Sequence, residues 1–161
     1  MLRSLKRTIV AAVLAACSLS ACASARRAEW RFRPVGFSGA ELEEVREGVR
    51  LWRKLGVDVD VSDSPSAHPI YRVTGGPIRA ENGRAGCGSD GCSVELYPLW
   101  WWDDGTVRAV TAHEVGHVVT GRWDHLTEGS EGAMAEYLDG STDFTEADRA
   151  WACEGAGYGC D

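Results

Sequence analysis

The segment from His113 to His117, which reads HEVGH, constrains the fold of this chain more than any other part of the sequence. It lies in a run from Val107 to about Thr120 in which valines recur on apolar faces, and Gly121 follows where a helix would end. On a helix, side chains four residues apart leave the same face about one turn apart. The sequence therefore predicts a helix that brings the His113 and His117 imidazoles together.

Two imidazoles in this arrangement can bind one Zn²⁺ ion through their ring nitrogens, and Glu114 lies beside them. Zinc lowers the pKa of a bound water and polarises a carbonyl, while a carboxylate takes the proton of that water and passes it to a leaving amine. The pattern therefore indicates metal-assisted hydrolysis of peptide bonds. The alternative is a solvent-facing helix with two idle histidines.

A catalytic zinc ion takes three protein ligands and keeps one open position. His125, eight residues after His117, is a candidate for the third ligand because Gly121 lets the chain leave the helix and turn back. Glu136, nineteen residues after His117, is the other candidate. The spacing alone leaves this choice open.

The beginning of the chain has the layout of a secretory signal. Arg3, Lys6 and Arg7, without an acidic residue among them, precede the apolar run TIVAAVLAA, which is too short to span a membrane by itself. The run ends in LSAC, which resembles a bacterial lipobox and predicts lipidation of Cys22, although LAAC, ending at Cys17, has the same form. Lipidation at Cys22 leaves four cysteines, an even number suited to an oxidising compartment, whereas lipidation at Cys17 leaves five.

We therefore expect a lipoprotein signal peptide over residues 1–21, a lipidated tether over 22–29 and one domain over 30–161. An uncleaved membrane anchor is the alternative. The expected location is the cell envelope, facing the periplasm or the exterior, and Ala23 after the lipidated cysteine favours the outer membrane in a Gram-negative cell. Without the basic residues of the signal, 14 basic and 24 acidic residues remain, which argues against nucleic acid as a partner. We expect a monomer.

The remaining pattern predicts an α+β fold. Four short runs have the composition of strands: Trp30–Val35, Val57–Val61, Ile70–Val73 and Val94–Tyr97. Ser38 with Glu41 forms a capping-box pattern before a helical stripe that should end near Gly56, and Thr145 with Asp148 forms another before a C-terminal helix. We expect a small twisted mixed β-sheet packed with two main helices and a C-terminal helix.

The cysteines of the domain lie in two local pairs. The stretch GCGSDGC predicts a turn closed by a disulfide between Cys87 and Cys92, since a metal knuckle, the alternative, would need the paired CxxC form. Cys153 and Cys160 would tie the last helix to the C-terminal tail. Four cysteines permit three connectivities, so local pairing is a preference. For Trp100–Trp102 we expect partial burial under a loop, and the rim of a substrate cleft is the alternative.

Three segments in succession resemble the matrixin-type metzincins, a family of zinc metallopeptidases. They are HEVGHVVTGRWDH, GAM at 132–134 and YLDGSTDFTEADRA, against a family pattern of HExxHxxGxxH, a Met-containing turn and a closing helix. Upstream, VRLWRKLGVDVDV is similar to the family's first helix and following strand, and GCSVELYP to its cleft-edge strand. The resemblance implies a metzincin-like fold and an extended peptide substrate bound along that strand. It implies His113, His117 and His125 as zinc ligands, Glu114 as general base and Met134 in a turn beneath the metal.

The spacing departs from the family at the third ligand. The family places Gly three and His six residues after the second histidine, whereas Gly121 and His125 lie four and eight residues after His117. Asp124 and Glu136 therefore stay as alternative ligands, and Glu136 would make the site a gluzincin-type one. Tyr137 is expected to pack, with a hydrogen bond to a transition-state oxygen as the alternative.

The sequence thus predicts a lipid-anchored zinc metalloendopeptidase with one catalytic Zn²⁺ ion, with Glu114 as general base and a peptide or protein as substrate. A structural Ca²⁺ ion is not indicated. The competing function is that of a non-catalytic, metal-binding envelope lipoprotein that acts as a binding module.

Overall fold

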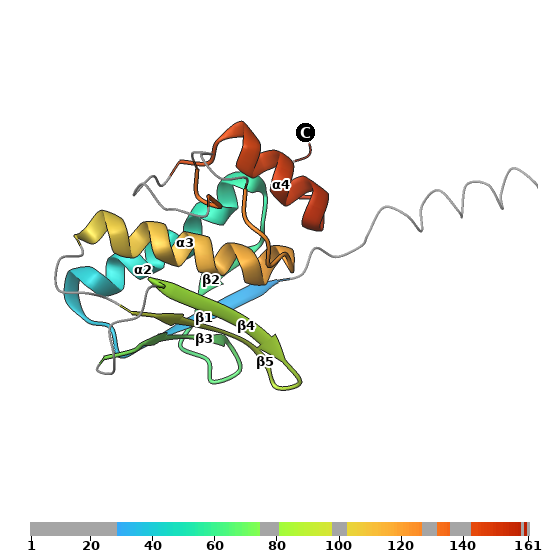
Figure 1. Ribbon diagram of the computed structural model, residues 1–161. Coiled ribbons are helices and arrows are strands. Elements are labelled where there is room, and N and C mark those ends of the chain that lie inside the picture. The colour runs from blue at the N-terminus through green and yellow to red at the C-terminus, as the bar shows by residue number, and fades with distance from the viewer. Residues whose placement is uncertain are drawn as a thin grey trace, which may run out of the picture.

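The computed structural model describes residues 29–74, 81–97, 103–126, 132–135, 143–158 and 160. Within these residues the chain forms one five-stranded β-sheet and three α-helices. Two long helices lie over one face of the sheet, and the third lies on the far side of these two (Figure 1). The expected α+β class with a mixed sheet is confirmed.

Four strands of the sheet are parallel to one another, and one edge strand is antiparallel. Its strands are β1 (Trp30–Val35), β2 (Val59–Val61), β3 (His68–Arg72), β4 (Gly83–Gly88) and β5 (Gly91–Leu96). They lie in the order β2-β1-β3-β5-β4, with β4 antiparallel to β5 and the other pairs parallel. Apolar side chains such as Phe32, Ile70 and Val94 point from three neighbouring strands into the core.

Strand β4 was not expected, because its segment was interpreted as part of a Gly-rich turn. Glycine weakens a strand, and three of the six residues of β4 are glycines. The strand forms because it pairs along its whole length with β5, and the Cys87–Cys92 disulfide links directly opposite residues of the two strands.

The expected cleft-edge strand GCSVELYP is also wrong in position. Its β5 segment lies inside the sheet, paired with β3 on one side and β4 on the other. β5 is the last of the parallel strands, and β4, its antiparallel hairpin partner, pairs with its outer side. The edge position next to β5 is therefore that of β4. This leaves β4 as the strand that lies against the histidine-bearing helix (Figure 1).

The helices are α2 (Gly39–Leu51), which continues as the 3₁₀ helix η1 (Trp52–Leu55), α3 (Asp104–Thr120) and α4 (Glu146–Ala156). Gly56 ends the first of them, as expected. The Thr145–Asp148 capping box is formed. The Ser38–Glu41 box is not, because Ser38 makes no side-chain cap bond and Glu41 instead accepts two hydrogen bonds, of 2.9 and 2.8 Å, from Arg72 Nε.

Helix α3 begins three residues earlier than the sequence indicated. The Asp103 side chain accepts a hydrogen bond of 2.7 Å from the Thr106 backbone N–H and caps the helix. At the other end, Gly121 has the left-handed conformation with φ 68°, which a glycine adopts without steric cost. The helix therefore ends where the sequence predicted.

The core joins the sheet to all three helices. Trp52 is fully buried, and its indole N–H donates to the Ala112 carbonyl at 2.8 Å, which fixes η1 against α3. The other large, fully buried apolar side chains are Phe32, Ile70, Leu96, Met134, Val45, Val49, Val59, Val94, Val110 and Val115. One continuous core thus holds the sheet, α2 and α3 in a fixed relation.

Several predicted features lie outside the described residues. They are the signal peptide, the lipidation candidates Cys17 and Cys22, nearly all of the tether, Trp100–Trp102, and the residues Glu136 and Tyr137. Among the helices in the described ranges, none combines the length and apolar character that crossing a membrane requires.

Candidate metal centre

The two histidines of α3 meet as their spacing predicts. His113 and His117 are both 5% exposed, and their Nε2 atoms lie 3.2 Å apart. Helix α3 can hold them in place because every residue from Val107 to Thr120 except Arg108 is buried. Two ring nitrogens therefore point at one position from a rigid element.

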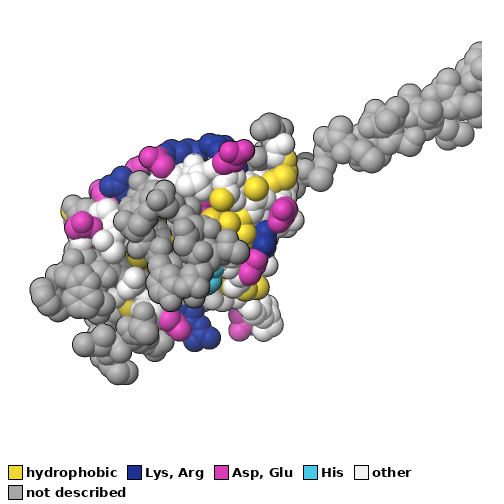
Figure 2. All heavy atoms as spheres, turned by 45° about the horizontal axis from the view of Figure 1, so that its top comes forward, with side chains coloured by type: hydrophobic (Ala, Val, Ile, Leu, Met, Phe, Trp, Pro, Cys, Tyr) yellow, Lys and Arg dark blue, Asp and Glu magenta, His cyan; other side chains and the backbone are white. Residues whose placement is uncertain are grey.

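The turn after Gly121 returns the chain to the same position. His125 Nε2 lies 3.1 Å from His113 Nε2, and the His125 ring stacks on the His113 ring at 4.9 Å. One ligand atom from each of the three residues falls within 4.8 Å of the others, a grouping that could hold a metal ion. His125 is the exposed member of this triad, so the site opens to solvent on its side. On the face drawn in Figure 2, a small area of histidine is visible at the surface.

Backbone carbonyls orient both buried histidines. His113 Nδ1 lies 2.8 Å from the Ala133 carbonyl oxygen, and His117 Nδ1 lies 2.7 Å from the Arg122 carbonyl oxygen. A carbonyl can only accept, so each Nδ1 carries the proton and donates it. The Nε2 lone pairs are then directed at the shared position, which is how metal-binding histidines are usually held.

Electrostatics also keeps the two rings neutral in the metal-free protein. Burial, together with the neighbouring His117, lowers the pKa of His113 to about 3. Burial likewise lowers the pKa of His117. Neutral imidazoles are the form that binds a metal ion.

Glu114 is buried between α3 and the edge strand. Strand β4 passes so close that a Cβ at Gly83 would lie 2.8 Å from Glu114 Cγ, and only a glycine leaves room there. Burial, with a smaller contribution from the charge of Glu81, raises the pKa of Glu114 to about 8, although a hydrogen bond from the Ala85 backbone opposes the shift. The site therefore holds a shielded carboxyl group next to three imidazoles.

Met134 lies in a short turn beside the same helix. It is fully buried, and its Sδ lies 2.5 Å from where a Cβ would stand on Gly116, the residue before His117. The Met134 carbonyl accepts a hydrogen bond of 3.0 Å from the Leu126 N–H, which joins the turn to the residue after His125.

Asp148 anchors this turn, a role that the sequence did not reveal. Its carboxylate is fully buried and accepts hydrogen bonds from the N–H groups of Ala133 at 3.2 Å and Met134 at 2.8 Å. It also accepts bonds from the backbone and hydroxyl of Thr145. The capping-box pattern predicted only the bonds to Thr145. The link through Ala133 to His113 needed the fold.

The alternative ligand Asp124 is already engaged. Its two oxygens accept hydrogen bonds from Arg122, at 3.0 Å from Nε and 2.5 Å from Nη2. Arg122 lowers the pKa of Asp124 through this bond. The structure therefore brings His125, and not Asp124, to the two buried histidines.

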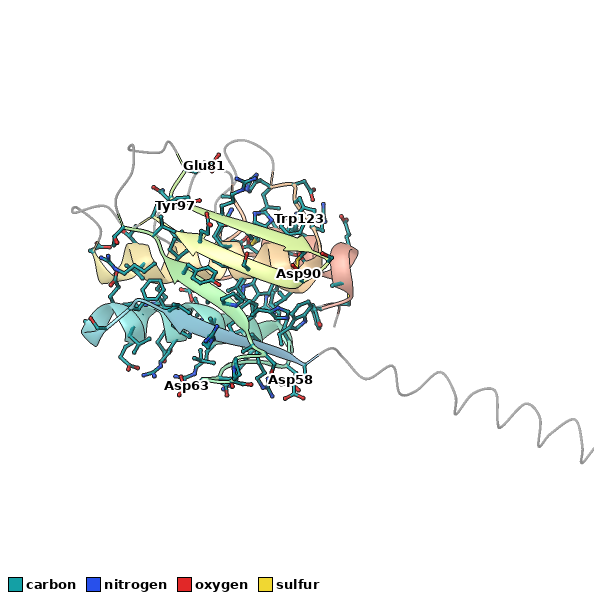
Figure 3. The ribbon with its side chains drawn as sticks, turned by 90° about the horizontal axis from the view of Figure 1, so that it is seen from below. Asp58, Asp63, Glu81, Asp90, Tyr97 and Trp123 are labelled. Carbon is teal, nitrogen blue, oxygen red and sulfur yellow. A yellow bond between two sulfur atoms is a disulfide. The ribbon has the colours of Figure 1, made fainter. Side chains whose placement is uncertain are left out.

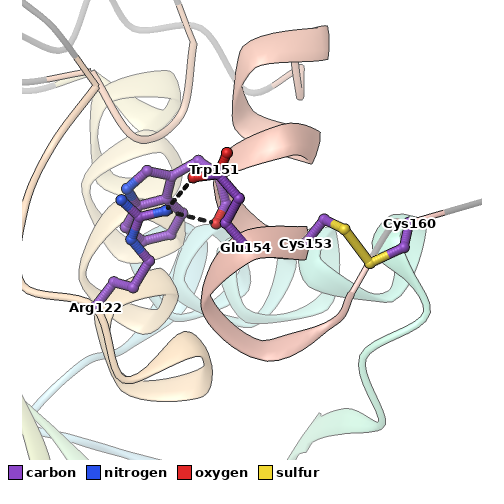
Figure 4. The surroundings of a disulfide bond; sticks show 5 residues. All are labelled: Arg122, Trp151, Cys153, Glu154 and Cys160. Carbon is purple, nitrogen blue, oxygen red and sulfur yellow. Dashed lines mark hydrogen bonds and ion pairs between the residues drawn. A yellow bond between two sulfur atoms is a disulfide. The ribbon is translucent and has the colours of Figure 1, made fainter.

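Arg122 is a second residue that sequence reasoning missed. Its guanidinium lies over the Trp151 ring at 4.8 Å, and it donates to the Trp151 carbonyl at 3.0 Å and to Glu154 at 3.4 Å (Figure 4). The turn that carries His125 is thereby joined to α4.

Both expected disulfides are formed. Cys87 pairs with Cys92 at the end of the β4–β5 hairpin, and Cys153 pairs with Cys160, which ties the last turn of α4 to the tail (Figure 4). A metal knuckle at Cys87 and Cys92 is thereby excluded.

A scan of the chain against protein families gives no match, and a search of curated proteins gives none either.

Proposed function

We propose that this protein is a zinc-dependent endopeptidase of matrixin-like type. The observation that carries the proposal is the grouping of His113, His117 and His125 within 4.8 Å, with the buried Glu114 carboxyl next to them on α3. A catalytic zinc site needs three protein ligands and an open fourth position. A nearby carboxyl group can then act as the general base.

The donor set fits Zn²⁺ better than other common ions. All three donors are imidazoles, two of them neutral and oriented by backbone carbonyls. Mg²⁺ and Ca²⁺ prefer oxygen ligands, and an all-imidazole set favours zinc or a neighbouring transition metal.

A zinc ion bound there would polarise a peptide carbonyl and lower the pKa of a water molecule in the open position. Glu114 takes the proton of that water as it attacks and later delivers it to the leaving amine. Gly83 and Ala85 keep the Glu114 carboxyl away from bulk water on the strand side. His113 and His117 keep their orientation throughout because their Nδ1–H groups continue to donate hydrogen bonds to the Ala133 and Arg122 carbonyls.

The arrangement around the site supports the matrixin-like part of the proposal. An antiparallel edge strand lies against the active-site helix, a turn with a buried methionine packs on that helix, and a capped helix closes the described chain. Ala85 directs a hydrogen bond to Glu114, so the unpaired side of β4 faces the site. An extended peptide could then bind along β4 by strand addition.

The proposed location is the cell envelope, with the protein anchored through a lipid on Cys22. The two disulfides support an oxidising compartment. Incorporation of labelled palmitate that is lost in Cys22→Ala and kept in Cys17→Ala tests the anchor.

The purified protein tests the activity. We expect about one zinc ion per chain by elemental analysis, cleavage of peptides from a broad library, and loss of cleavage on chelation and in Glu114→Gln. Glu114→Gln should keep its zinc, because the side chain is not a ligand. Zinc bound at one per chain without cleavage of any peptide or protein would instead identify a binding module.

The third ligand needs its own comparison. His125→Ala should release zinc, whereas Asp124→Asn and Glu136→Gln should retain it. His68→Ala is the matched control, because this fourth histidine packs against Trp30 and Phe32 away from the site. Zinc loss in Glu136→Gln alone would replace this ligand set by the gluzincin-type one.

A further inference from the structure

We propose that Trp123 forms a binding subsite for an aromatic or branched apolar side chain of the substrate, close to the bond that is cleaved. The inference rests on the proposed peptidase function and assigns to it a preference that the metal site alone does not give.

Trp123 is a large apolar residue whose side chain is exposed to solvent. Its side chain is 50% exposed, and among the described residues the only other exposed large hydrophobic is Tyr71 at 41%. Trp123 stacks on the His117 ring with centroids 5.9 Å apart and an interplanar angle of 16°. One face of the indole thus lies against a proposed zinc ligand, and the remainder of the ring is open to solvent.

The chain holds the indole in place on both sides. The carbonyl of Arg122, the preceding residue, accepts a hydrogen bond of 2.7 Å from His117 Nδ1–H, and Arg122 and Asp124 are joined across Trp123 by two hydrogen bonds. A side chain fixed in this way loses little conformational freedom when a ligand covers it. Trp123 is therefore prepared for contact.

The surroundings favour an apolar partner. The open surface of the indole is flat and apolar, and covering it removes that surface from water. The adjacent charges of Arg122 and Asp124 neutralise each other, so they offer little to a charged side chain.

The distance sets which substrate residue is involved. The indole lies 5.9 Å from the His117 ring, and an extended peptide advances about 3.3 Å per residue. In Figure 3, Trp123 lies toward the Asp90 end of the edge strand β4, away from Glu81. A peptide along β4 would therefore place on Trp123 a side chain within about two residues of the scissile bond.

The first test compares substrates that differ at one position. A peptide library should show a preference for Phe, Leu or similar residues at one position within about two of the cleaved bond. The ratio of kcat/KM for the Phe peptide to that for its Ala analogue should fall about 10- to 100-fold in Trp123→Ala and much less in Trp123→Phe. Tyr71→Ala, the matched control, should leave the ratio unchanged. An unchanged ratio in Trp123→Ala at equal zinc content, or a preference for charged residues there, overturns the proposal.

The second test separates this inference from the peptidase function. Calorimetry with zinc-loaded Glu114→Gln should give tighter binding of the Phe peptide than of the Ala peptide, and adding Trp123→Ala should remove the difference. If wild type cleaves nothing but this difference is found, catalysis fails and the subsite stands. If wild type cleaves peptides but Trp123→Ala affects neither binding nor selectivity, the subsite fails and the peptidase function stands.

Discussion

Burial shifts the pKa of Glu114 and the pKa values of the two buried histidines in opposite directions. Burial favours the neutral form of each buried group, so it lowers the pKa of His113 to about 3 and raises that of Glu114 to about 8. In the metal-free protein the site therefore resists charge of either sign. A bound cation reverses this for the carboxyl group, because a nearby positive charge stabilises its ionised form.

This difference gives a pH dependence that Glu114→Gln should expose. The folded protein keeps the Glu114 proton between its ordinary pKa of 4.5 and about 8, while the unfolded chain loses it. The free energy of unfolding of the wild-type protein therefore falls as the pH rises through this window, because only the unfolded chain releases the proton. The free energy of unfolding of metal-free Glu114→Gln should exceed that of wild type by a margin that grows by about 1.4 kcal/mol per pH unit.

Urea unfolding of both proteins at pH 5, 6.5 and 8 in the presence of a chelator measures this margin. The opposite contribution of His113, which is lost as the pH falls below 6.5, is common to both proteins and cancels in the comparison. Saturating zinc should shrink the margin. A margin that is constant from pH 5 to pH 8 would contradict the prediction.

Asp148 shows how a residue outside the triad can set its geometry. The carboxylate holds the Ala133 and Met134 N–H groups, and the Ala133 carbonyl holds His113. Asp148→Ala leaves buried donors unpaired and should destabilise the protein by about 3 kcal/mol or more. Asp148→Asn keeps one oxygen acceptor and should cost less.

Chemical unfolding and zinc titration of both Asp148 variants check this prediction. Asp143→Asn, at an exposed position before α4, is the control and should change neither quantity appreciably. Zinc affinity that is unaffected in a folded Asp148→Asn protein would show that the turn does not transmit its position to His113.

At the scale of elements, the sequence was most informative where local chemistry decides the structure. Gly121 and the Thr145–Asp148 box mark helix ends because backbone groups at those ends need particular partners. Periodicity likewise predicted that His113 and His117 would meet. Strand β4 was missed because its glycines argue against a strand, while its pairing with β5 and its approach to Glu114 are long-range. The carbonyls of Ala133 and Arg122 have no side-chain signature, so their roles could not be predicted.

His125 lies two residues further from His117 than the matrixin-type pattern places it, with one extra residue in the helix and one in the loop, and this longer loop contacts α4. Arg122 joins this loop to α4 through the Trp151 carbonyl and ring, and also binds Asp124 next to His125. Arg122→Ala should weaken zinc binding about 10- to 100-fold because the third histidine is no longer held in place. Arg122→Lys should restore little, since it cannot form the paired bonds.

Competition with a chromophoric chelator measures these affinities, and the visible spectrum of Co²⁺-substituted protein reports whether the ligand geometry changes. Glu154→Gln removes only an exposed contact of 3.4 Å and should bind zinc like wild type. Equal zinc affinity in Arg122→Ala and wild type would mean that the loop keeps its shape without α4.

At the scale of the whole molecule, one core and one site depend on the same elements. Trp52 joins η1 to α3 at Ala112, next to His113, and Met134 packs on α3 at Gly116, next to His117. The two disulfides lie elsewhere in the fold, one in the β4–β5 hairpin and the other at the end of α4. Stabilisation of the histidine site should therefore spread to the entire cooperative unit.

Zinc should accordingly raise the melting temperature of the complete protein in a single transition. Free zinc at a thousand times Kd adds about 4 kcal/mol to a two-state fold, provided that the unfolded chain does not bind it. For a domain of this size that amounts to a shift of roughly 10–20 °C. His117→Ala should abolish the shift, whereas His68→Ala should preserve it, because only the first change removes a ligand. Scanning calorimetry with and without zinc checks this prediction. If zinc stabilised only the surroundings of the site, an additional transition that does not depend on zinc would appear at a lower temperature.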